Sequence, residues 1–164
     1  MPATYEPIAT TTLGSAATSI SFTSIAGTYT DLRIVFTHAT ALPDNLNFRF
    51  NSDSGANYSD TYMVGDGTAA SSTRNTGMTY TELPYSDTAN SFCTYDIFSY
   101  AGSTFKTALA TYSADANGTG WVVRLVSLWR STSAITSITM RSGAAGSLNF
   151  PVGTTATLYG IKKA

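Results

Sequence analysis

The fold of this chain is decided by the stretch Phe22-Thr-Ser-Ile-Ala-Gly-Thr-Tyr-Thr-Asp-Leu-Arg-Ile-Val-Phe36. Its first half places Gly27 among Thr, Tyr and Asp residues, a composition typical of a turn. Apolar and mostly polar residues then alternate, and the apolar set is Leu32, Ile34 and Phe36. A period of two is that of a β-strand with one face in the core. The stretch therefore predicts a turn followed by a half-buried strand over residues 31–38.

The same strand-like pattern recurs along the chain. It predicts further strands over residues 18–22, 45–50, 91–98, 104–112, 120–130, 135–140 and 155–161. Segment 120–130 is apolar on nearly both faces, which is typical of a central strand, and we expect Trp121, Val123 and Leu125 to be buried in the sandwich. Asn117-Gly118 lies between two of these runs and predicts a hairpin. No window repeats apolar residues every 3.6 positions, so we expect any helix to be short.

Composition favours the same fold class. The 164 residues suffice for one domain, and only 12% of them are charged, about half the usual share. Thr is abundant, and its branched Cβ favours strands, as do the ten Tyr and eight Phe residues. We therefore predict an all-β, jelly-roll-like antiparallel β-sandwich with an extended N-terminal arm. Residues 1–18 would form the arm, and residues 19–164 the sandwich domain.

Two of the segments without the strand pattern bear on binding. Residues 10–18 are a low-complexity Thr/Ser-rich lead, and Tyr5 and Ile8 before it are apolar anchors that would dock the arm on a partner or on its own domain. Residues 65–77 form the longest unpatterned stretch. A loop of that length is usually functional or mobile, so we expect it to be available for binding.

Charge and cysteine content exclude several classes of function. The net charge of −1 gives no attraction to nucleic acid or to an anionic membrane. Cys93 is the only cysteine, so an internal disulfide and a cysteine-based zinc site are excluded, and its place in a strand favours a buried thiol. No apolar run reaches the ~20 residues that span a bilayer, and the start does not resemble a signal peptide. We expect synthesis in a cytoplasm.

No constellation of residues points to catalysis or to a cofactor. His38 is the only histidine, and no Gly-x-Ser-x-Gly segment accompanies it, so a structural or surface histidine is favoured over a catalytic one. Most carboxylates lie beside Gly, Asn or Ser, as turn-forming residues do, whereas Asp96 lies in an aromatic strand and should face solvent or pair with an Arg. Residues 51–60 superficially resemble a calcium loop, but Gly55 is misplaced and a bidentate Glu is missing, so a turn stabilised by Asx side chains is favoured. We expect neither enzymatic activity nor a bound metal.

Tyrosines are the remaining candidates for binding. The candidates for a surface, interface or glycan contact are Tyr58, Tyr62, Tyr80 and Tyr85, and Tyr112 is a further tyrosine with the same alternatives. Tyr packs in cores and protein interfaces with its hydroxyl at the rim, and it also stacks on sugars. The sequence favours a core or protein-interface role and keeps a sugar-stacking platform as the alternative.

Several motifs together resemble a family of small virion proteins of tailed bacteriophages. They are the Tyr29-Thr-Asp-Leu32 strand start, the segment Arg49–Ser59, the segment Leu128–Ile138, and the finish Asn149–Ile161, which ends in Leu-Tyr-Gly-Ile. Each motif is weak by itself, and together they cover most of the chain. Residues 61–90 follow no pattern of this family.

The resemblance implies a structural role in a virion. We expect a capsid cement or decoration protein on the outer surface of the phage head, where its partners would be the major capsid protein and further copies of the chain, with a trimer favoured. The alternative is a receptor-binding module of a tail fibre or tail tip, which would hold a cell-surface glycan with the 65–77 loop and its tyrosines. A depolymerase is disfavoured because no convincing acid pair is present.

Overall fold

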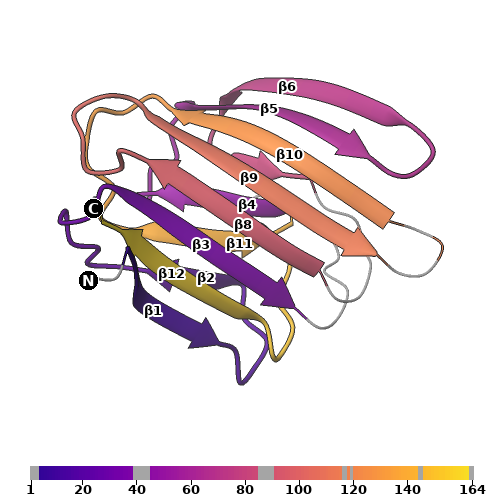
Figure 1. Ribbon diagram of the computed structural model, residues 1–164, viewed down its shortest axis with the longest axis horizontal. Coiled ribbons are helices and arrows are strands. Elements are labelled where there is room, and N and C mark those ends of the chain that lie inside the picture. Colours follow the sequence, from indigo (N-terminus) through magenta and orange to yellow (C-terminus); the bar gives the residue numbers. More distant parts are fainter. Residues whose placement is uncertain are drawn as a thin grey trace.

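The computed structural model describes residues 4–38, 45–84, 91–115, 118, 120–143 and 146–162 (Figure 1). These residues form strands and connecting turns, with no α-helix among them. The strands are β1 (Tyr5–Thr12), β2 (Ser19–Phe22), β3 (Asp31–His38), β4 (Leu46–Phe50), β5 (Tyr58–Gly65), β6 (Ala70–Met78), β7 (Thr81–Leu83), β8 (Ser91–Phe98), β9 (Lys106–Asp115), β10 (Gly120–Trp129), β11 (Ile138–Ser142) and β12 (Thr155–Ile161).

Two antiparallel sheets of unequal size pack face to face. The large sheet has the strand order β1-β12-β3-β8-β9-β10-β5-β6, and the small sheet has the order β2-β11-β4-β7. Figure 1 shows the small sheet behind the middle of the large one. The predicted all-β sandwich is confirmed. The large sheet extends beyond the small one at β5 and β6, and this overhang positions one of the candidate sites described below.

The predicted strands all have a counterpart in the structure. The first of them, residues 31–38, is β3, whose Leu32, Ile34 and Phe36 are buried. The expected central strand is β10, which pairs with β9 on one side and β5 on the other. Only one face of β10 enters the core, however. Val123 and Leu125 are buried, while Val122 on the opposite face is 62% exposed.

The prediction of a long loop over residues 65–77 is wrong. Residues 70–78 form strand β6, which pairs with β5 in a hairpin. Its turn is closed by the Asp66 carboxylate, which accepts hydrogen bonds from the backbone N–H groups of Thr68 and Ala69 at 2.8 and 2.7 Å. Since β6 is an edge strand with both faces largely exposed, it needs no apolar residues, and its Ser/Thr-rich sequence shows no alternation.

The N-terminal segment docks on its own domain, one of the two predicted possibilities. Residues 5–12 form β1, which pairs along its length with β12 at the edge of the large sheet. Ile8 packs against the core, and Thr10 and Thr12 exchange hydroxyl hydrogen bonds of 3.0 and 2.9 Å with threonines of β12. This part of the predicted arm is therefore a strand of the sandwich.

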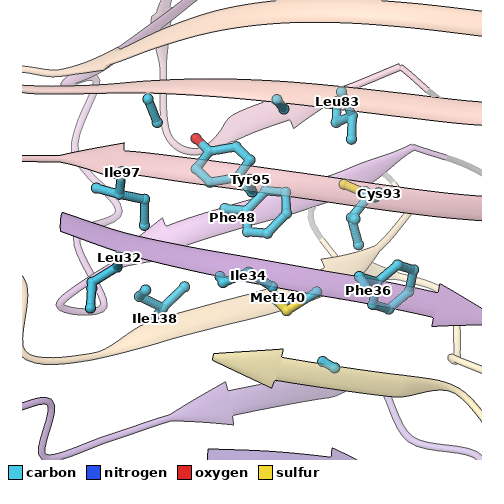
Figure 2. Packing of buried hydrophobic residues seen from close by; sticks show 14 of the residues in the cluster. Leu32, Ile34, Phe36, Phe48, Leu83, Cys93, Tyr95, Ile97, Ile138 and Met140 are labelled. Carbon is cyan, nitrogen blue, oxygen red and sulfur yellow. The ribbon is translucent and has the colours of Figure 1, made fainter. Parts of the chain in front are cut away.

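The core lies between the inward faces of the two sheets (Figure 2). Phe48 of the small sheet stacks on Tyr95 of the large sheet, with ring centroids 4.1 Å apart. Cys93 lies in the same layer, and burial raises the pKa of its thiol far above the usual range. The prediction of a buried, unreactive thiol agrees with this environment.

A corner of hydrogen bonds follows β4. Asp53 accepts hydrogen bonds from the backbone N–H of Gly55 at 2.8 Å, from the Asn57 side chain at 2.9 Å and from the Trp129 indole at 2.7 Å. Burial would raise the pKa of Asp53, but these bonds outweigh it and the pKa is lowered. The predicted turn stabilised by Asx side chains is confirmed, with Asn51 and Ser52 in left-handed backbone conformations.

Candidate functional site

The first candidate site is the outer face of the large sheet, the side that turns away from the small sheet. Every second residue along each strand lies on this face, and residues paired across strands share it, so that Val126 of β10 lies between Leu109 of β9 and Thr61 of β5. Large apolar side chains are exposed on it: Met63, Phe92, Phe98, Val122 and Val126, each at least 40% exposed. Met63, Val122 and Val126 lie on the neighbouring strands β5 and β10, which makes this part of the face the candidate interaction surface.

Charges on the outer face are few and mostly engaged within the protein. Arg33 donates two hydrogen bonds to the Asp96 carboxylate, and the bond from Nη2 is 2.9 Å long. This confirms the expected pairing of Asp96, and the same bond raises the pKa of Arg33. Arg74 and Arg124 each donate to a threonine hydroxyl of the neighbouring strand. Arg33 and Asp96 neutralise each other, whereas a partner that buries this face would have to supply a carboxylate or other acceptors for the Arg74 and Arg124 guanidiniums.

The outer face is large enough for a stable interface. Eight strands about 4.8 Å apart and about eight residues long cover roughly 900 Å². A specific protein–protein interface buries about 800 Å² on each partner. Tyr5, the first predicted anchor, lies at the edge of this face, where it is 46% exposed and the Arg33 guanidinium stands 5.4 Å from its ring centre.

The second candidate site is a hollow of about 390 Å³, here called the hairpin groove. It exists because β7 is the edge of the small sheet and contacts β5 and β10, so no strand among the described residues covers the inward face of the β5–β6 hairpin beyond β7. Figure 1 shows this hairpin projecting from the body of the sandwich. The groove is lined by Asn45, Tyr62, Val64, Asp66, Ala69, Ser71, Thr73, Pro84 and Trp121.

Aromatic rings and small polar groups share the hairpin groove. Trp121 and Tyr62 are partly buried against the core, while Ser71 and Thr73 of β6 are exposed. Trp121 also borders a neighbouring hollow of about 550 Å³ at the ends of β8, β9 and β10. Two backbone hydrogen bonds hold the pKa of Asp66 below its usual range, so this lining carboxylate is charged at neutral pH.

The structure separates the predicted aromatic residues. Tyr62 lines the hairpin groove, whereas Tyr80 lies beneath the Arg49 guanidinium on another part of the surface. Tyr85 lies outside the described residues. The prediction of Tyr58 as a surface aromatic is wrong, because its side chain is 0% exposed and its hydroxyl accepts a hydrogen bond from Phe50 N at 3.1 Å. Tyr112 is also fully buried.

Sequence reasoning missed the role of Trp121, which it assigned to the core. Its strand pattern placed it with Val123 and Leu125, and all three do share one face of β10. Only the extent of the small sheet decides that Trp121 reaches past the core into the groove. The outer face did leave a signal, because Val122 and Val126 make the second face of β10 apolar.

The only histidine lies in a buried position. His38 Nε2 and the Ser91 hydroxyl are hydrogen-bonded across β3 and β8, and both residues are 5% exposed or less. A nucleophile must meet its substrate, and this serine is enclosed by the core. Within the described ranges, no cluster of three or more His, Cys, Asp or Glu side chains is placed to hold a metal ion. The same residues contain no helix long and apolar enough to cross a membrane.

Comparison of the chain with family models, curated proteins and solved structures finds no match. The function is therefore argued from the two sites and from the motifs of the chain. The outer face offers a broad, weakly charged surface for a protein partner, and the hairpin groove offers a small aromatic hollow on the opposite side of the same sheet.

Proposed function

We propose that this protein is a non-enzymatic structural component of a tailed-phage virion, a cement or decoration protein that docks on the major capsid protein. The observation that carries the proposal is the outer face of the large sheet, with its exposed apolar residues, its Arg33–Asp96 pair and its roughly 900 Å² extent. The sequence motifs that resemble those of phage virion proteins indicate that the partner of this face is a phage head.

Cement action follows from binding thermodynamics. A protein that binds the assembled head but not its separated parts stabilises the head by mass action. The apolar residues of the outer face contribute affinity, and the paired charges avoid a large desolvation cost. The proposal includes a homotrimer on the outer surface of the head, with Tyr5 at the edge of the interface.

Aspartate substitution of the outer face tests the proposal. Val122→Asp and Val126→Asp place a charge where the interface would be desolvated, so purified variant should bind about tenfold or more weakly to heads that lack the protein. Val152→Asp is the matched control, because Val152 is 59% exposed but lies in the turn before β12. Binding is measured by co-sedimentation, and head stability by DNA release on heating.

Two results would count against cement function. One is binding to heads that Val122→Asp and Val126→Asp leave unchanged while the variants remain folded. The other is a set of particles without this protein whose heads are fully stable but which no longer adsorb to cells. The second result would support the receptor-binding alternative.

A further inference from the structure

We propose that the hairpin groove is a binding site for a neutral oligosaccharide of pyranose units. The proposal rests on the residues that line the groove and on its shape. It stands apart from capsid docking, because it concerns the inward face of the β5–β6 overhang and not the outer face.

The aromatic side chains supply the first part of the argument. Tyr62, Val64 and Trp121 lie on the same face of neighbouring strands, as the pairing of Val64 with Val123 and of Tyr62 with Leu125 requires. Aromatic faces carry a partial negative charge and attract the weakly positive C–H groups on the face of a pyranose ring. Trp121 and Tyr62 therefore provide two stacking surfaces with an apolar floor between them.

The spacing of the two aromatic residues sets the length of the ligand. The position on β5 opposite Trp121 is residue 66, because Val122 pairs with Gly65. Tyr62 lies four residues before it, which corresponds to about 13 Å along a strand. The two backbone positions are farther apart than one sugar ring is long, so oligosaccharides are the ligands to test.

The polar lining favours a neutral sugar. Ser71 and Thr73 offer hydroxyls, and Asn45 offers an amide. Such groups pair with sugar hydroxyls as donors and acceptors. The ionisable groups among the lining residues are the Asp66 carboxylate and the weakly acidic Tyr62 phenol, with no Lys or Arg among them. Asp66 can accept from a hydroxyl and would repel a phosphate, sulfate or uronate, so acidic polymers are disfavoured.

The groove and the outer face lie on opposite sides of one sheet. Tyr62 and Val64 point inward, whereas Met63 between them is on the outer face and 60% exposed. A protein bound through its outer face would thus keep the groove open to the surroundings.

Fluorescence titration of the purified protein tests the proposal. The probes are cellohexaose, maltohexaose, mannohexaose, xylohexaose and chitohexaose, with an oligogalacturonate as the acidic comparison. Trp129 is 2% exposed and its indole N–H is bonded to Asp53, so a ligand-induced change in emission should come from Trp121. We expect at least one neutral probe to bind and shift the emission, while glucose alone does not.

Variants then locate the binding. Trp121→Ala and Tyr62→Ala should each weaken binding about tenfold or more, which corresponds to about 1.4 kcal/mol. Phe105→Ala is the matched control, since Phe105 is 53% exposed and lies outside the groove. If truncating Trp121 unfolds the protein, the isosteric Thr73→Val variant replaces it and should weaken binding by about threefold.

Three outcomes would overturn the proposal. They are no binding of any neutral probe, binding of the oligogalacturonate alone, and binding that folded groove variants leave unchanged. Head co-sedimentation of Tyr62→Ala separates the two proposals, because Tyr62 lies on the inward face and the outer face is intact in this variant. Loss of sugar binding with normal docking on heads is the expected pattern.

Discussion

Replacing Asp60 by Asn should make the protein more stable at neutral pH. Asp60 is 1% exposed on the inward face of β5. One of its carboxylate oxygens accepts a hydrogen bond from Glu82 N of β7 at 2.7 Å, and the other has no hydrogen-bond partner. Burial raises the pKa of Asp60 to about 7, and the nearby Glu82 carboxylate adds to the shift.

The direction of the pH effect follows from the two pKa values. In the unfolded chain the carboxyl loses its proton near the ordinary value of 3.8, whereas in the folded protein it keeps the proton up to about 7. Between these values only the unfolded state gains from ionisation, so stability falls as pH rises and is constant above about 7. A shift of about 3 units at about 1.4 kcal/mol each gives a loss of at most about 4 kcal/mol.

Urea unfolding of wild type and Asp60→Asn over a pH series measures this effect. Asn keeps an oxygen for Glu82 N and has no charge, so the variant should gain on the wild type by up to about 1.4 kcal/mol per pH unit between about pH 4 and 7. Asp66→Asn is the control. Its carboxyl has a lowered pKa, so the stability that it contributes is present above the unfolded pKa and is lost as pH falls.

The reasoning would be refuted by a stability difference between wild type and Asp60→Asn that does not change with pH while both proteins remain folded. Such a result would mean that Asp60 ionises in the folded protein as readily as in the unfolded chain. A difference with the opposite slope would mean that the native structure stabilises the carboxylate.

Three further perturbations test the fold. Leu125→Ala should cost about 2–5 kcal/mol in denaturant unfolding, because it leaves a cavity, and a loss below about 0.5 kcal/mol would contradict the assigned core; Val126→Ala on the outer face is the control. Deletion of residues 1–12 removes β1 and uncovers β12, so it should lower the melting temperature and promote aggregation, and an unchanged melt would show that β1 adds nothing to the sandwich. Chelator should leave the melting temperature unchanged, whereas a rise of several degrees with calcium would reveal a metal site at residues 51–60.

Local sequence determined the strands that enter the core. Most inward positions of β3 and β8 hold apolar residues, such as Leu32 and Ile97. Their period of two is visible in the sequence without a structure. The turn at residues 51–60 could also be predicted, because Asp53 and Asn57 bond to groups within a few residues. The alternation and the turn both depend on residues that are close in the sequence, so they can be predicted from the sequence alone.

Strands that bury few apolar side chains could not be predicted from the sequence. β6 consists largely of Ser, Thr, Asn and Gly, and β1 of Thr and single apolar residues, and each exists because a neighbouring strand supplies its hydrogen bonds. For β1, the stabilising hydrogen bonds come from β12, a segment far away in the sequence. For β6 they come from a hairpin partner, β5, that showed no pattern either.

Tertiary structure alone decided which faces and side chains remain available. Tyr58 and Tyr62 are four residues apart on one face of β5, yet Tyr58 is fully buried in the core while Tyr62 lines the hairpin groove. The difference arises because the small sheet ends at β7, and the number of strands in each sheet is a property of the whole chain. For the same reason, the sequence predicts Trp121 to be a core residue, whereas in the structure it lines the hairpin groove.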